Sequence, residues 1–104
     1  MTIIYTKDFV AYLDSLVYTL FKKEYFGFVE SADDYVDKIY EFIEESIQTF
    51  PAKKTPKKLK IFGQNYIFYK SNQTTTWYIF FEVLNNNYLI TNIINSNSED
   101  VKFL

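Results

Sequence analysis

The sequence predicts an α+β domain: one strand, two helices, then a three-stranded antiparallel meander, with both helices packed on one face of the sheet. Two observations indicate this class. Apolar residues recur at helical spacing through most of the first half of the chain, whereas the second half alternates strand-like segments with turn residues. The chain has 104 residues, of which 48% are apolar. This size and composition predict a single domain over residues 1–104 with its own hydrophobic core.

The first strand and the first helix are predicted from residues 2–21. Residues 2–5 are β-branched and aromatic, which favours a short strand. Thr6 can cap the helix that follows, and Asp8 complements the positive end of the helix dipole. From Phe9 to Phe21 the apolar residues fall on one helical face, and Gly27 then allows the chain to turn.

The second helix is predicted over residues 31–51. Ser31 is a good N-cap and Pro51 marks the stop. The expected buried stripe consists of Ala32, Val36, Ile39, Ile43 and Ile47. Six of the thirteen acidic residues lie on this helix, so its outer face is negative, and we interpret that face as solvated rather than catalytic.

The meander is predicted from three strand-like segments, residues 59–70, 75–84 and 88–94. The middle segment is apolar on both faces, which suits a central strand. Three asparagines at 85–87 predict a hairpin loop between the last two strands.

Two further features concern the ends of this region. Gly63 and Asn65 are expected to mark a bulge or a kink in the segment 59–70. In the C-terminal tail, Val101, Phe103 and Leu104 are apolar after a polar stretch, so they are expected to dock on the body of the domain or on a partner.

The absent residue types limit the chemistry. The chain has no histidine, no arginine and no cysteine, which excludes imidazole acid/base catalysis, guanidinium clamps, disulfides and thiolate metal sites. We expect neither a metal nor a cofactor. No apolar run reaches membrane-spanning length and no signal peptide is recognisable, so a cytoplasmic protein is expected.

Positive charge gathers in one short segment. It begins between two prolines and continues into a run of apolar residues. It contains five of the eleven basic residues: Lys53, Lys54, Lys57, Lys58 and Lys60. If a strand begins here, the alternation of Lys58 and Lys60 places both on one face, where a phosphate could bind, and Tyr66 and Tyr69 could stack on bases. A solvated loop whose lysines protect a strand edge fits the segment equally well.

The whole chain resembles the RelE/ParE family of toxins from type II toxin–antitoxin (plasmid stabilisation) modules. Residues 3–16 (IIYTKDFVAYLDSL) resemble the family's first strand and helix, residues 31–51 its second helix, and KLKIFGQNYIFYK its central strand. The resemblance implies a toxin that acts on ribosome-bound mRNA or on DNA gyrase, and that an antitoxin protein neutralises.

The resemblance also implies roles for individual residues. Lys58 and Lys60 match the Lys-x-Lys pair of the ribonuclease members and Tyr66 the strand tyrosine, so these three are the catalytic candidates. Lys53, Lys54, Lys57 and Tyr69 are the candidates for nucleic-acid binding. Where the family has an arginine after the tyrosine, this chain has Ile67, and after the last strand it offers Asn95, Ser96 and Asn97 in place of an arginine or histidine.

Three hypotheses therefore stay open: a toxin that acts in part by binding, a ribosome-dependent mRNA endonuclease that uses Lys58 and Lys60, and a degenerate, non-catalytic family member that serves as a protein-interaction module. Loss of one acid/base group typically lowers a rate by about 10²- to 10⁴-fold, so the missing groups count against the endonuclease.

Overall fold

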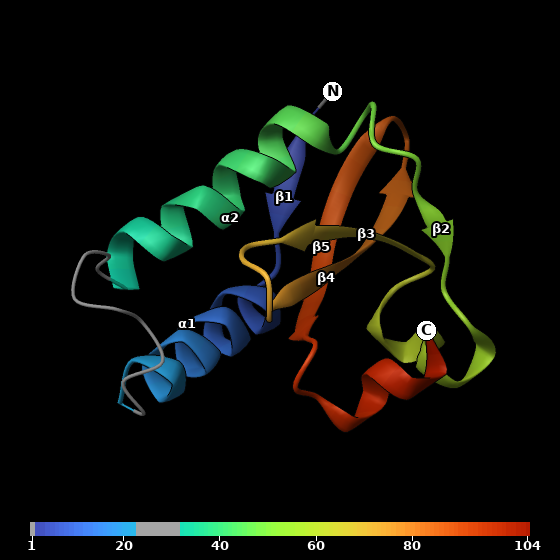
Figure 1. The fold of residues 1–104 in the computed structure, drawn as a ribbon. Helices are drawn as coiled ribbons and strands as arrows, with labels where there is room; N and C mark the ends of the chain where they lie inside the picture. The colour runs from blue at the N-terminus through green and yellow to red at the C-terminus, as the bar shows by residue number, and fades with distance from the viewer. Residues whose placement is uncertain (1, 23–31) are drawn as a thin grey trace.

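The computed structural model describes residues 2–22 and 32–104, and it has an α+β fold (Figure 1). The strands are β1 (Ile3–Tyr5), β2 (Lys53–Lys54), β3 (Asn65–Lys70), β4 (Thr76–Leu84) and β5 (Asn87–Asn95). The helices are α1 (Lys7–Lys22) and α2 (Ala32–Ser46), with two 3₁₀ helices, η1 (Lys57–Phe62) and η2 (Glu99–Phe103).

The five strands form one sheet in the order β1-β5-β4-β3-β2. β1 pairs parallel with β5, and every other pair is antiparallel. The apolar segment β4 is the central strand, as its sequence predicts. The structure adds one strand to the predicted four, because the first two lysines of the basic segment pair with β3.

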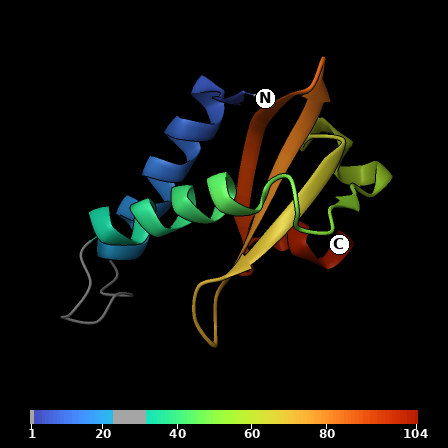
Figure 2. The ribbon, with the colours of Figure 1, turned by 90° about the horizontal axis from the view of Figure 1, so that it is seen from above.

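Both helices lie on the same face of the sheet, as predicted (Figure 2). Thr6 caps α1, since its Oγ1 accepts a hydrogen bond from the Phe9 amide at 3.1 Å. The second helix ends at Ser46 rather than at Pro51, because the amides of Thr49 and Phe50 both turn back to the Ser46 carbonyl. Gly27 and Ser31, predicted as a turn and an N-cap, lie outside the described residues.

The main core lies between the helices and the sheet. Its buried members come from α1, α2, the turn after α2 and strands β3 to β5: Phe9, Leu13, Tyr35, Ile39, Ile43, Ile47, Ile67, Trp77, Ile79, Phe81, Ile90 and Ile93. A polar link crosses this core, because the Trp77 indole donates to the Tyr35 hydroxyl at 2.7 Å, which lies 2.6 Å from Ser71 Oγ. This link satisfies the buried indole N–H and fixes α2 against the sheet.

The predicted hairpin joins β4 to β5 through Asn85 and Asn86. Both adopt positive φ, 49° and 67°, a conformation that asparagine tolerates and that two-residue hairpins require. The register shifts between Phe80 and Phe81, so that Thr91 is the extra residue of β5.

The segment 57–62 departs from the predicted strand. It forms the 3₁₀ helix η1, and the strand starts only at Asn65. Leu59 and Phe62 lie three residues apart, so one turn of a 3₁₀ helix places both against the sheet, and Ile61 is left 90% exposed. The prediction that Lys58 and Lys60 share one face of a strand is therefore wrong.

Gly63 follows η1 and lies against the bulge of β5. The predicted bulge in the segment 59–70 is absent from β3, whose register with β4 is regular. The φ of Gly63 is 155°, and a Cβ here would lie 2.7 Å from Thr91 Oγ1 and 2.9 Å from the Phe81 nitrogen. The Thr91 hydroxyl also contacts the Phe62 carbonyl, so the chain passes close against the bulge. Only glycine fits this approach without strain.

Candidate nucleic-acid interface

A second, smaller core covers the sheet face away from the helices. Leu59, Tyr66, Phe80 and Ile94 are its buried members. Phe62 of η1 and three residues of the tail, Val101, Phe103 and Leu104, pack against them, which confirms that the tail docks on the domain. The two 3₁₀ helices cover only part of this face, and Phe68 and Tyr78 beside them are only partly buried.

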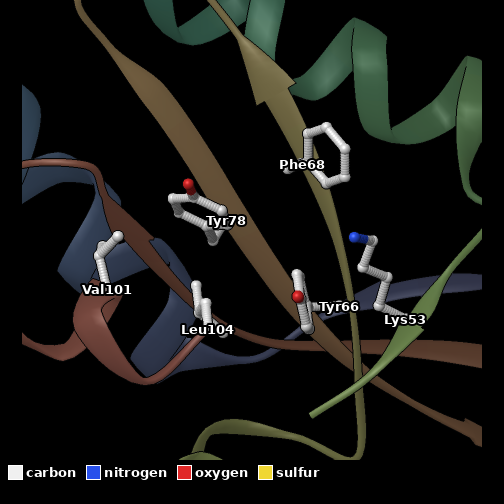
Figure 3. Close-up of a pocket in the computed structure, with 6 residues that line it drawn as sticks. All are labelled: Lys53, Tyr66, Phe68, Tyr78, Val101 and Leu104. Carbon is white, nitrogen blue, oxygen red and sulfur yellow. The ribbon is translucent and has the colours of Figure 1, made fainter. Parts of the chain in front are cut away.

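A pocket of about 310 Å³ opens at the uncovered part of this face (Figure 3). Aromatic side chains from the central strands form its floor, and Lys53 and the tail form its sides: Lys53, Tyr66, Phe68, Tyr78, Val101 and Leu104. Phe68 pairs directly with Tyr78 across β3 and β4. Flat rings with one open side are the surfaces on which nucleic-acid bases stack.

Strand register explains why these side chains meet. Alternate residues of a strand point to opposite faces, so Tyr66 and Phe68 share the pocket face while Ile67 and Tyr69 enter the main core. Lys53 lies directly opposite Tyr66 in the β2–β3 pair and therefore points to the same face. Its ammonium nitrogen is 5.7 Å from the centre of the Phe68 ring.

The other predicted lysines lie apart from the pocket floor. Lys54 pairs with Asn65 and so points to the opposite side of β2 from Lys53. Lys57 is exposed on η1, and the Lys60 ammonium donates to Gln64 Oε1 at 3.2 Å. The Lys58 ammonium lies 4.8 Å from the centre of the Phe103 ring, at the junction of η1 and η2.

The two tyrosine candidates also separate. Tyr66 lines the pocket, and its hydroxyl has no hydrogen-bond partner among the described residues, so it is available to a ligand. Tyr69 lies on the helix side, where its ring stacks on Phe42 with 5.0 Å between centroids. Tyr69 is therefore not part of this site.

The protonation of Tyr66 limits what it can do. Burial, followed by the neighbouring Tyr78 hydroxyl, raises the pKa of Tyr66 above its ordinary value of 10.0. At neutral pH its hydroxyl is therefore a hydrogen-bond donor rather than a base. With no histidine in the chain, the site is better equipped to bind than to abstract a proton.

Raised tyrosine pKa values predict that the fold weakens in alkali. Burial raises the pKa of Tyr66, Tyr40 and Tyr5, and for Tyr5 the Glu44 carboxylate, its hydrogen-bond partner, adds to the effect. Since these hydroxyls hold their protons more tightly in the folded state, their contribution is complete below pH 10.0, the unfolded value, and is lost as the pH rises beyond it.

Urea unfolding followed by circular dichroism should show a constant midpoint from pH 7 to about pH 9 and a falling one above about pH 10. A Tyr5→Phe variant should show a shallower fall. An unchanged midpoint at about pH 11 would contradict the raised values.

Sequence reasoning missed Phe68, Tyr78, Val101 and Leu104 as parts of the site. The signal for the two rings is present, because Phe68 follows Tyr66 at spacing two in one predicted strand and Tyr78 belongs to the next. The tail residues carried no such signal beyond their apolar character.

Comparison with known proteins gives no match: no family model, no curated protein and no solved structure matches this chain. Within the described part of the chain, no helix has the length and apolar character that crossing a membrane requires. In the same residues, no three acidic side chains gather in a way that could hold a metal ion.

Proposed function

We propose that this chain is the toxin of a type II toxin–antitoxin module, and that it inhibits growth by binding single-stranded RNA in the aromatic pocket. One observation carries the proposal: the partly buried rings of Phe68 and Tyr78 line an open pocket beside the buried ring of Tyr66, with Lys53 at its edge. Stacking surfaces combined with positive charge are the usual means of holding single strands.

The family assignment rests on the resemblance of the sequence, and the arrangement of the elements supports it. Two N-terminal helices occupy one face of the sheet, which leaves the other face, with its lysines, for a ligand. A neutralising antitoxin protein and a ribosomal site of action follow from this assignment, with DNA gyrase as the alternative target.

Binding rather than cleavage is the action that the site favours. The Lys60 ammonium donates to Gln64 and the Lys58 ammonium lies over the Phe103 ring, and both residues belong to a 3₁₀ helix, so the two lysines are not aligned on one face of a strand. The pKa of Tyr66 is raised by burial, so no side chain of the pocket is an obvious base. An mRNA endonuclease based on Lys58, Lys60 and Tyr66 is the less favoured form of the proposal.

A protein-interaction module is the second candidate, and exposed apolar residues favour it. Ile4 of the edge strand and Val83 and Leu84 beside the hairpin are each about half exposed. Such residues suit contact with another protein. A chain that only served this role would not arrest growth.

Growth after induction of the chain alone tests the proposal. We expect growth arrest, and we expect co-expression of the neighbouring open reading frame to relieve it. Ribosome footprinting then distinguishes an action on ribosome-bound mRNA from an action on DNA gyrase. Unchanged growth, with folded protein confirmed by circular dichroism, would contradict a toxin and favour the interaction module.

Lys53→Gln and Lys54→Gln form a matched pair for the pocket. Both remove one charge from β2, but only Lys53 points to the aromatic face. Hydrogen bonds to charged groups contribute about 1.5–3 kcal/mol, so Lys53→Gln should weaken RNA binding roughly 10-fold or more, with weaker arrest. Lys54→Gln should behave as the parent chain. Equal effects of the two variants would place the RNA elsewhere.

A further inference from the structure

The two edges of the sheet differ in how they are protected against further strand pairing. Within residues 2–22 and 32–104, β1 and β2 are the edge strands, at opposite sides of the sheet (Figure 1). Natural proteins block an open edge with charged side chains, lysine above all, and β2 consists of two lysines. β1 consists of Ile3, Ile4 and Tyr5, so its edge carries no protecting charge.

The unprotected edge also has an exposed apolar side chain. Ile3 and Tyr5 pack against the main core on the helix side of the sheet. Ile4 lies between them, so it points to the other face, where it is 45% exposed. An open, uncharged edge with an exposed apolar side chain is a place where a strand of another chain can add to the sheet.

The charges beside β1 indicate which strand fits. Glu44 of α2 is exposed, and it accepts a hydrogen bond from the Tyr5 hydroxyl at 3.4 Å. The helix as a whole contains six acidic residues and one lysine. Pairing of β1 with β1 of a second copy would bring two such helices together on one face, which like-charge repulsion disfavours. A strand with positive side chains fits better, and β2 is such a strand.

We propose that this chain associates head to tail with a second copy of itself, by pairing of β1 with β2 of that copy. Within one copy β2 runs antiparallel to β1, because β1 is parallel to β5 and three antiparallel pairings lead from β5 to β2. A second copy in the same orientation therefore continues the sheet with an antiparallel pair, and its helices lie on the same face.

The side chains of the two edges complement each other in this arrangement. Lys53 points to the pocket face and Lys54 to the helix side. Since neighbouring strands lie about 4.8 Å apart, Lys54 of the second copy would reach Glu44 beside Tyr5. Lys53 of the second copy would lay its alkyl chain along Ile4. The contact is short and partly ionic, so it is weak and sensitive to salt.

Sedimentation velocity tests the association without RNA, so the inference does not depend on the proposed function. At low ionic strength the weight-average sedimentation coefficient of the parent chain should rise with protein concentration. At about 0.5 M salt the rise should be smaller, because the charges are screened. The rise should continue beyond the value of a dimer, since a head-to-tail contact leaves one free edge at each end.

Two charge reversals identify the contact. Glu44→Lys and Lys54→Glu should each abolish the rise, and an equimolar mixture of the two variants should restore it, because lysine 44 of one then faces glutamate 54 of the other. Lys70→Glu is the control: it changes the net charge as Lys54→Glu does, but Lys70 is the exposed last residue of the inner strand β3, and the rise should persist. Circular dichroism establishes that each variant folds.

The outcomes separate this contact from other kinds of association. A folded parent chain with no concentration dependence would overturn the proposal and leave the RNA pocket untouched. An association that stops at a dimer and strengthens in Glu44→Lys would overturn it in favour of symmetric β1 pairing. An equal loss in Lys70→Glu, or a mixture that does not recover, would show an effect of net charge and overturn it too.

Discussion

Gly63→Ala is expected to lower the free energy of unfolding by about 3 kcal/mol or more. Two costs add at this position. The φ of 155° is one that alanine rarely adopts, and the new Cβ would lie only 2.7–3.0 Å from Thr91 Oγ1, the Phe81 nitrogen and Phe80 Cβ. Because one of these atoms belongs to the backbone of the central strand, the clash cannot be relieved by a side-chain rotation. Urea unfolding measures the loss.

Thr91→Ala in the Gly63→Ala background separates strain from crowding. This change removes the hydroxyl nearest to the new Cβ but leaves the Phe81 nitrogen at 2.9 Å and the backbone angle unchanged. We therefore expect only partial recovery, after correction for the effect of Thr91→Ala alone. Full recovery would show that the hydroxyl alone was the obstacle, and a Gly63→Ala variant as stable as the parent would contradict the close approach at the bulge.

The helices and the central strands could be predicted because their patterns admit one interpretation. Ile39, Ile43 and Ile47 keep helical spacing in α2, and all three are buried. The segment 76–84 is apolar on both faces, which only a central strand can bury, and it is the middle strand of the sheet. Asparagines at the hairpin supply the positive φ that the turn needs.

The basic segment could not be assigned in the same way, because two periods coexist in it. Lys58 and Lys60 alternate at period two, which favours a strand, whereas Leu59 and Phe62 recur at period three, which suits a 3₁₀ helix. The second pattern prevails, since it buries both apolar residues against the far face of the sheet. Because the strand period was preferred, the sequence analysis wrongly predicted that the two lysines share one face.

The site was predictable in kind but not in membership. Lysines and strand tyrosines were expected, and Lys53 and Tyr66 do line the pocket. Tyr69 is excluded by parity, because a residue three positions from Tyr66 on the same strand must point to the other face. The positions of Val101 and Leu104 depend on where the tail docks, which no local pattern specifies.

Phe68→Leu and Tyr78→Leu are each expected to lower RNA affinity about 5- to 150-fold, because stacking on one aromatic ring contributes about 1–3 kcal/mol per base. The two rings pair across β3 and β4 with centroids 6.4 Å apart and form the floor of the pocket. Leucine keeps an apolar side chain against the second core but offers no flat surface. Anisotropy with labelled single-stranded RNA measures the loss.

Tyr69→Leu supplies the matched control, because it removes a ring from the same strand on the opposite face. Its stacking on Phe42 belongs to the main core, so this variant should lose stability and keep its RNA affinity. Phe68→Leu and Tyr78→Leu remove rings that are as partly buried as Tyr69, so they should cost similar stability, but they alone should lose RNA affinity. If all three variants lost affinity in proportion to their stability, the RNA surface would not be this face of the sheet, and the aromatic pocket would be a packing feature alone.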